Sequence, residues 1–254
     1  MKNIFDSHAH YNDEQFDIDR DSLLASLPEA GIVGIINCGT DVASSAASLE
    51  MAEKYPFVYA ACGYHPESAL EFTDDNLTEI EKMLSHGKCV AVGEIGLEYH
   101  YDFVPKDVQI AVFEKHLQLA VKHDMPVIVH DREAHADTMA LLKKYKPKGV
   151  LHCYSGSAEM AKEVLKLGMY IGLGGAVTFK NAVKPVEVAE MIPLDRLLLE
   201  TDCPYMAPVP MRGKRNNSAY IEFVAEKIAS VRGISAQELL DITADNTRKL
   251  FDIK

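Results

Sequence analysis

The stretch that decides the fold stands at the start of the chain and reads Ile4-Phe5-Asp6-Ser7-His8-Ala9-His10. A short apolar run leads into two histidines that are one residue apart. In an extended strand, successive side chains point to opposite faces, so His8 and His10 share a face, together with Asp6. Two imidazoles on one face can hold a metal ion, but a His-x-His pair also occurs without one. The residues that follow the other apolar runs decide between these readings.

Seven more short apolar runs follow along the chain, separated by longer amphipathic stretches. The expected strands are residues 4–8, 32–38, 57–63, 89–94, 127–130, 150–152, 170–174 and 197–202. Residues 22–27, 111–121 and 160–167 have the apolar spacing of helices, and two more helices are expected after Ser218. Ser157 and Ser235 stand where helix N-caps are expected.

Strand–helix alternation repeated about eight times is the layout of an α/β fold of the (β/α)₈ or TIM-barrel type. The competing fold is a doubly wound open sheet, but the dinucleotide fingerprint that often accompanies it is missing, because the glycines at 172–175 come late and lack its spacing. No linker or repeat divides the chain. We therefore expect a single domain over residues 1–254, with the site at the carboxyl ends of the strands.

Composition excludes several other classes of protein. Apolar residues make up 48% of the 254 and charged residues 25%, which is typical of a globular protein. The net charge of −12 argues against a protein that coats nucleic acid by charge alone, although bound divalent ions would reverse the sign locally. No secretory signal and no apolar run near 18 residues is present, so we expect no membrane span. No obligate protein partner is evident.

Five cysteines without a C-x-x-C pair do not resemble a disulfide framework. They favour a reducing cytoplasm, and we expect all five to be small buried apolar residues.

Residues with metal-binding side chains follow five of the expected strands. They are His8, His10, Glu94, His130, His152 and Asp202. A single buried histidine is more often a hydrogen-bonded core residue, but six such residues converging on one face of a barrel are improbable by chance. Six ligands exceed the needs of one tetrahedral ion, so we expect two divalent cations that share a carboxylate. Histidine with carboxylate suits zinc, manganese, nickel and, less naturally, magnesium.

Two such cations predict hydrolysis. A water between them loses its proton near neutral pH, and their charge stabilises the oxygens of a phosphate ester. Asp202 is the candidate that accepts the proton of this water. The first hypothesis is therefore a metal-dependent deoxyribonuclease, acting on DNA or another phosphodiester.

Two further hypotheses stay open. An amidohydrolase-like enzyme would cleave an ester, lactone or amide, including aminoacyl esters, at the same site, and the acidic composition slightly favours it. A non-catalytic barrel with structural metals would bind a partner protein, but structural zinc sites are closed, whereas open coordination positions are expected here.

Eight segments carry a family resemblance. They are DSHAH (6–10), GYHP (63–66), GEIGL (93–97), PVIVH (126–130), HCYSG (152–156), GLGGAVTFK (172–180), LETDCPY (199–205) and APVPMRGK (207–214). In this order, over nearly the whole chain, they resemble the TatD-like metal-dependent deoxyribonucleases, which belong to the wider class of metallohydrolase barrels.

The resemblance implies roles for particular residues. His8, His10, Glu94 and Asp202 would bind one ion, and Glu94, His130 and His152 the other, with Glu94 as the bridge. The residues on the substrate side would be His65, Arg132, Tyr154 and Arg212. Glu200 would share a face with Asp202 if its strand stays regular, either supporting the ligands or binding an extra ion.

The chain departs from the family pattern in three places. Leu97-Glu98-Tyr99-His100-Tyr101 replaces the usual aspartate and paired aromatics, Arg215-Asn216-Asn217-Ser218 stands where Asn-Glu-Pro is common, and His116 replaces a frequent glutamine. None of these residues is an expected metal ligand, so we expect the departures to affect the choice of substrate and not the metal site.

A compact basic cluster lies in the loop after the eighth expected strand and comprises Arg212, Lys214 and Arg215. Because this loop is expected to lie over the mouth of the barrel, we expect the cluster to grip phosphate.

Overall fold

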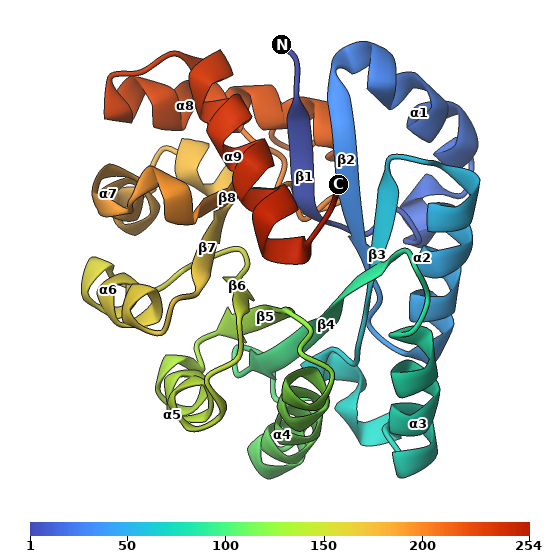
Figure 1. The fold of residues 1–254 in the computed structure, drawn as a ribbon. Helices are drawn as coiled ribbons and strands as arrows, with labels where there is room; N and C mark the ends of the chain where they lie inside the picture. Colours follow the sequence, from blue (N-terminus) through green and yellow to red (C-terminus); the bar gives the residue numbers. More distant parts are fainter.

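The computed structural model describes residues 1–254, and its centre is one sheet of eight parallel strands in the order β1 to β8 (Figure 1). The strands are β1 (Ile4–Ala9), β2 (Ile32–Cys38), β3 (Val58–Cys62), β4 (Cys89–Glu98), β5 (Val127–Arg132), β6 (Gly149–Leu151), β7 (Tyr170–Leu173) and β8 (Leu197–Leu199). A parallel bridge between Ala9 and Cys203 joins the segment after β8 to β1. The predicted (β/α)₈ barrel is thereby confirmed.

Helices surround the sheet in chain order. They are α1 (Arg20–Ser26), α2 (Val42–Lys54), α3 (Asp74–Met83), α4 (Lys106–Lys122), α5 (His135–Tyr145), α6 (Ala158–Lys166), α7 (Val183–Met191), α8 (Ile221–Arg232) and α9 (Ala236–Phe251). The hydroxyls of Ser157 and Ser235 accept hydrogen bonds from the first turns of α6 and α9, as expected of N-caps. None of these helices combines the length and the apolarity that crossing a lipid bilayer requires.

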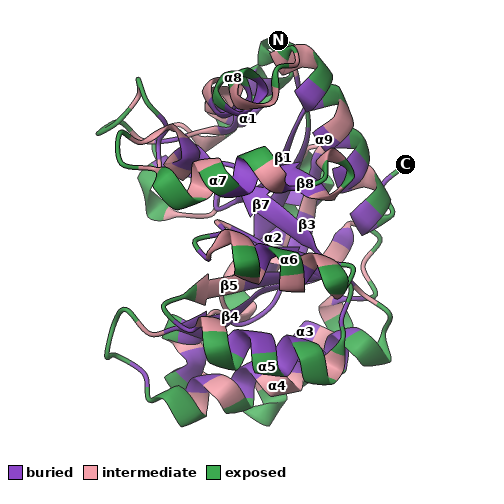
Figure 2. Cartoon of the chain, turned by 90° about the vertical axis from the view of Figure 1, so that its left-hand side faces the viewer, coloured by how far each residue is buried: buried purple, intermediate pink, exposed green.

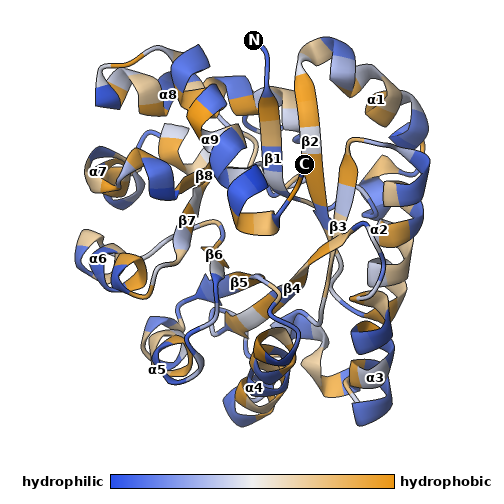
Figure 3. Ribbon diagram, in the orientation of Figure 1, coloured by the Kyte–Doolittle hydropathy of each residue, from blue (hydrophilic) through white to orange (hydrophobic).

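Each strand contributes one apolar residue to a layer inside the barrel. The layer contains Phe5, Ile36, Ala61, Ala91, Ile128, Val150, Tyr170 and Leu198. Residues of α9, among them Phe251, pack against it, so this helix covers one end of the barrel. The strands are almost entirely buried, whereas the helices expose one side (Figure 2) and alternate in hydropathy along their length (Figure 3). The barrel interior is therefore a packed core that supports whatever lies above it.

The ends of β4 and β8 differ most from the expectation. β4 continues four residues past Glu94, because its pairing with β5 extends to Leu97 with Asp131 and Glu98 with Arg132. β8 ends at Leu199, so Asp202 is not a strand residue but lies in the following loop, at a φ of 56°.

The expectation for the cysteines was wrong at one position. All five are free, but Cys153 is only half-buried, because it also lies in a loop, at a φ of 44°.

His116, on α4, is fully buried outside the site. Its Nδ1 lies 2.8 Å from the carbonyl oxygen of Val112, and its Nε2 has no hydrogen-bond partner. The ring packs beside those of Tyr64 and Phe72. Burial lowers the pKa of the imidazole to about 4, so His116 is neutral in the folded protein at pH 7.

We expect His116→Gln to make the folded protein less sensitive to acid. The unfolded chain takes up this proton near pH 6.5 and the folded chain only near pH 4, so the contribution of a neutral His116 is lost as pH falls through this window. Between pH 7 and pH 5 the unmodified protein should lose about 2 kcal/mol more of its unfolding free energy than the variant. Urea unfolding at the two pH values measures the difference, and identical pH dependence of the two proteins would contradict it.

Candidate metal centre

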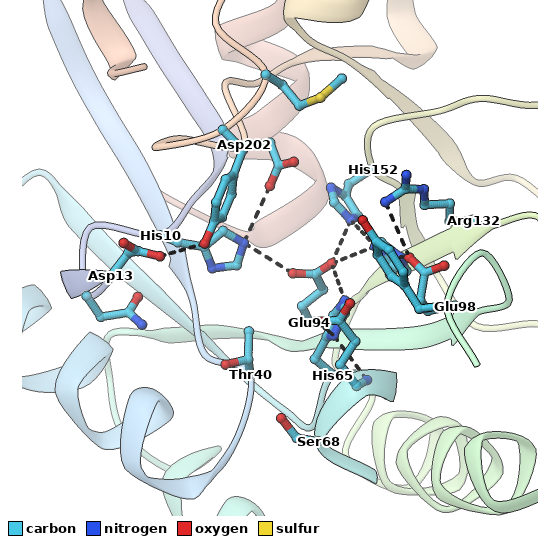
Figure 4. A pocket seen from close by; sticks show the side chains of 16 residues that line it. His10, Asp13, Thr40, His65, Ser68, Glu94, Glu98, Arg132, His152 and Asp202 are labelled. Atoms are coloured by element: carbon cyan, nitrogen blue, oxygen red, sulfur yellow. Dashed lines mark hydrogen bonds and ion pairs between the residues drawn. The ribbon is translucent and has the colours of Figure 1, made fainter. Parts of the chain in front are cut away.

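The carboxylate of Glu94 lies at the centre of a cluster of histidines and is 3% exposed (Figure 4). Its Oε2 lies 3.3 Å from Nε2 of His8 and 3.2 Å from Nε2 of His10. Its Oε1 lies 3.0 Å from Nδ1 of His130 and 2.8 Å from Nε2 of His152. Each carboxylate oxygen therefore faces a different pair of imidazoles.

Asp202 completes the set of six residues that the sequence predicted. Its Oδ1 lies 3.6 Å from Nε2 of His8 and 3.5 Å from Nε2 of His10, on the same side as Oε2 of Glu94. All six side chains, which come from positions 8 to 202, are thus brought together.

The two-residue period of the strands positions two of the histidines. On β5, Ile128 belongs to the apolar layer inside the barrel, so His130, two residues on, points to the same side. The same alternation runs from Val150 on β6 to His152, directly after the strand. The metal-binding side chains therefore form the next layer above the packed core.

Asp6 positions the loop that carries Asp202. It is fully buried, and its carboxylate accepts hydrogen bonds from the Thr201 amide at 3.0 Å, the Thr201 hydroxyl at 2.6 Å and the Ser218 hydroxyl at 2.6 Å. Burial raises the pKa of this carboxyl to about 6, in spite of these hydrogen bonds. In addition, the Asp202 amide donates to the carbonyl oxygen of His8 at 3.0 Å. Asp6 thus fixes the loop that carries Asp202. It does not face the cluster, in contrast to the expectation that it shares a face with His8 and His10, because the pairing of β1 with β2 is irregular between Asp6 and Ala9.

The ring nitrogens that point away from Glu94 have partners that fix the orientation of His10 and His130. Nδ1 of His10 lies 3.0 Å from the carbonyl oxygen of Cys38, which can only accept, so Nδ1 carries a proton and Nε2 is the ring atom that faces Glu94. Nε2 of His130 lies 3.2 Å from Oε2 of Glu98. A carboxylate or carbonyl behind the ring is the usual support for a metal-binding histidine.

The charges around the cluster keep both carboxylates ionised. Burial alone would raise the pKa of the Glu94 carboxyl, but His152 and His8 hold it well below its usual range. The pKa of Asp202 is also lowered, because its contact with His10 outweighs burial. Conversely, burial opposes the protonation of His10, but the two carboxylates raise its pKa to about 10.

The donor set fits divalent cations. Three groups have ligand atoms that all lie within 4.8 Å of one another: His8, His10 and Glu94; His8, His152 and Asp202; His65, Glu94 and His130. Imidazole nitrogens and carboxylate oxygens at this spacing are what zinc and related metals bind. These nitrogen and oxygen atoms can each donate an electron pair to a cation placed between them. The residues are therefore able to hold metal ions.

Of the four residues expected on the substrate side, three lie beside the cluster: His65, Arg132 and Tyr154. Nε2 of His65 lies 3.5 Å from Oε1 of Glu94, so His65 joins the cluster. Arg132 lies at the mouth, 3.8 Å from Glu98. Tyr154 is buried and forms a wall of the site.

Arg212 does not line either cavity beside the cluster, in contrast to the expectation that its loop grips phosphate. Its Nη1 donates to the carbonyl oxygen of Ala207, and its guanidinium lies 4.1 Å from the ring centre of Phe179. Arg215 forms hydrogen bonds of 2.8 and 2.6 Å with the carboxylate of Asp19. Arg212 and Arg215 are therefore held by contacts with other segments of the chain, which the charge of their loop alone did not reveal.

Glu98 is the site residue that the sequence analysis missed. It is 2% exposed as a residue and lines the cavity at the mouth of the cluster. The expected strand ended at Glu94, so Glu98 was assigned to a loop. The signal was present, because the alternation Glu94, Gly96, Glu98 continues the same face of β4.

Glu200 lies beneath the cluster, fully buried. Its Oε1 accepts a hydrogen bond from the Cys153 amide, and its Oε2 has no hydrogen-bond partner. Burial raises the pKa of the carboxyl to about 8. Of its two expected roles, this position fits support of the neighbouring His152, whose Nδ1 lies 3.8 Å away.

A cavity of about 580 Å³ opens above the metal cluster. Its lining includes His10, Glu94, Arg132, His152 and Asp202 (Figure 4). Its rim also carries Asp13, whose carboxylate accepts a hydrogen bond of 2.7 Å from the Tyr205 hydroxyl. A substrate can therefore reach the cluster from solvent.

Comparison with known proteins gives matches over almost the whole chain. Residues 5–252 match the model of the family described as TatD related DNase. The chain is 43% identical to the uncharacterized metal-dependent hydrolase YabD of Bacillus subtilis, over 98% of this chain and 99% of that protein. It is 32% identical to the 3′-5′ ssDNA/RNA exonuclease TatD of Erwinia tasmaniensis, over 98% of this chain and all of that protein.

Among solved structures, the TatD homologue YJJV of Escherichia coli superposes with a TM-score of 0.93 at 33% identity, covering 99% of both chains. Motifs, fold, site geometry and relatives agree. The chain therefore belongs to the TatD related DNase family.

Proposed function

We propose that this chain, acting as one domain over residues 1–254, is a divalent-metal-dependent hydrolase that cleaves phosphodiester bonds in DNA. The observation that carries the proposal is the carboxylate of Glu94, with one oxygen facing His8 and His10 and the other facing His130 and His152. The names of the relatives, metal-dependent hydrolase and ssDNA/RNA exonuclease, support it. Its free cysteines suit the reducing cytoplasm, where we place it.

Two divalent ions fit the donor set in this proposal. His8, His10, Glu94 and Asp202 would hold one, and Glu94, His130 and His152 the other, with zinc, manganese, nickel and magnesium as the candidates. Bound there, such ions lower the pKa of a water and offset the negative charge of a phosphate.

The residues of the chain then have separate tasks in hydrolysis. The oxygen of one water forms a bond to phosphorus, and the bond from phosphorus to the leaving oxygen breaks. Asp202, whose carboxylate is ionised and 19% exposed, accepts the proton that the water loses, and this proton ends on the leaving oxygen. Arg132, 45% exposed at the mouth, offers its guanidinium fork to the phosphate oxygens, with His65 beside the reacting group.

A second candidate function follows from the charge of the mouth. The carboxylates of Asp13, Glu67 and Glu98 line the same cavity as Arg132, and the chain carries a net charge of −12. These carboxylates repel a polyanion and leave a neutral ester, lactone, amide or aminoacyl ester unaffected. The same donor set would serve the hydrolysis of such a bond.

Removal of metal should abolish activity. We expect chelator-treated protein to leave a labelled single-stranded oligonucleotide intact, and added manganese, zinc, nickel or magnesium to restore cleavage, because the phosphate charge is otherwise not offset. Gel analysis of the products and metal content per chain measure the effect, and Glu94→Ala, treated in the same way, should not recover. Undiminished cleavage without metal would contradict the proposal. Hydrolysis confined to carboxylic esters, lactones or amides would establish the second candidate.

Glu98→Gln should weaken metal binding without unfolding the protein. The amide retains the size of the side chain but removes the charge behind His130, and loss of such a support typically lowers metal affinity about tenfold to a hundredfold. Titration calorimetry of the metal-free protein measures the affinity directly. Asp13→Asn is the matched control, because Asp13 lines the same cavity but its carboxylate contacts the Tyr205 hydroxyl and no histidine of the cluster. Equal affinities of Glu98→Gln and the unmodified protein would show that Glu98 does not orient its histidine.

A further inference from the structure

A second cavity, of about 570 Å³, opens from the metal cluster on the side of β6 and β7. It shares His130, His152 and Asp202 with the cluster, so a substrate bound to the metals extends directly into it. Its outer wall is formed by the segment that enters α7, including Asn181 and Lys184. The volume lies within the range of sites that bind small molecules.

The two cavities differ in charge. The first is lined by the carboxylates of Asp13, Glu67 and Glu98 in addition to those of the cluster. In the second, the only added carboxylate is that of Asp131, and it accepts hydrogen bonds from His135 at 2.7 Å and Thr138 at 3.1 Å. Arg132 lines both cavities, and Lys184 adds a positive charge to the second alone. A phosphate chain is therefore better accommodated in the second cavity than in the first.

Two polar side chains of the second cavity have no partner within the protein. The Asn181 amide and the Lys184 ammonium are exposed and make no hydrogen bond or ion pair, so both are free to contact a ligand in the cavity that they line. The apolar side chains of Val183 and Pro185 lie beside them in the sequence and line the same wall, and Tyr154 also lines the cavity. The amide of an asparagine offers a hydrogen-bond donor and an acceptor to the edge of a base. Apolar and aromatic side chains can pack against the faces of the base, and an ammonium group can pair with a phosphate.

We propose that this cavity is the nucleoside subsite beside the scissile phosphate. Asn181 contacts the base, and Lys184 contacts the phosphate of the neighbouring nucleotide. The assignment rests on the proposed phosphodiesterase function and makes it more specific, because it places the nucleoside on the β7 side of the metal cluster.

Three kinds of substrate, of increasing length, test the subsite. Methyl p-nitrophenyl phosphate carries only the scissile phosphate, the 5′- and 3′-p-nitrophenyl phosphates of thymidine add a nucleoside, and single-stranded pentathymidylate adds neighbouring phosphates. Asn181→Ala should raise the KM for the nucleoside esters and for the oligonucleotide about fivefold to tenfold, as expected for a lost hydrogen bond. Lys184→Ala should raise the KM for the oligonucleotide alone, by about threefold to tenfold, and less so at high salt.

Controls separate failure of the subsite from failure of the function. Both variants should hydrolyse methyl p-nitrophenyl phosphate at the rate of the unmodified protein. Lys162→Ala removes an equally exposed lysine from α6 and should leave all three substrates unchanged. If the metal-loaded protein cleaves none of the three, the phosphodiesterase function is wrong. If it cleaves them and the Asn181 and Lys184 variants behave like the unmodified protein, or lose activity on all three equally, the subsite is wrong.

Discussion

The buried carboxylate of Glu94 is the group on which the rest of the site depends. A charge with 3% exposure loses its hydration, and only strong local interactions can offset that loss. Here the compensation comes from imidazoles on both sides of the carboxylate, and it depends on β4 pairing correctly with β5. Without Glu94, His8 and His10 would face His130 and His152 with no carboxylate between them. The geometry of the site therefore depends on the register of the sheet.

The same alternation of side chains stabilises the barrel and builds the site. Ile128 fills the interior and His130 lies one step above it, while Val150 and His152 repeat the relation on the next strand. A slip of one residue in register would move both histidines toward the helices and bring apolar residues to the metal centre. The burial of the apolar layer, which drives folding, therefore also selects the register that assembles the metal-binding residues.

How much could be predicted from the sequence depends on how local the signal is. The strands and the convergence of the six candidate metal-binding residues follow from apolar runs and from the meeting of strand ends, which are properties of the fold class. The left-handed backbone of Asp202 and the pairing of Arg215 with Asp19 depend on segments far apart in the chain, which no local pattern encodes. Glu98 lies between these cases. Its alternation with Glu94 was visible, but only the pairing with β5 extends the strand far enough to use it.

Charge links metal binding to substrate binding in this molecule. With a net charge of −12 and carboxylates at the mouth, the metal-free protein repels a nucleic acid. Divalent ions between Glu94 and its histidines would convert the floor of the site to a positive surface continuous with Arg132 and Lys184. Phosphate would then bind the ions as well as the protein, so each ligand would strengthen the binding of the other by the same factor. Under the proposed function, the acidic composition would therefore restrict nucleic acid binding to the metal-loaded state.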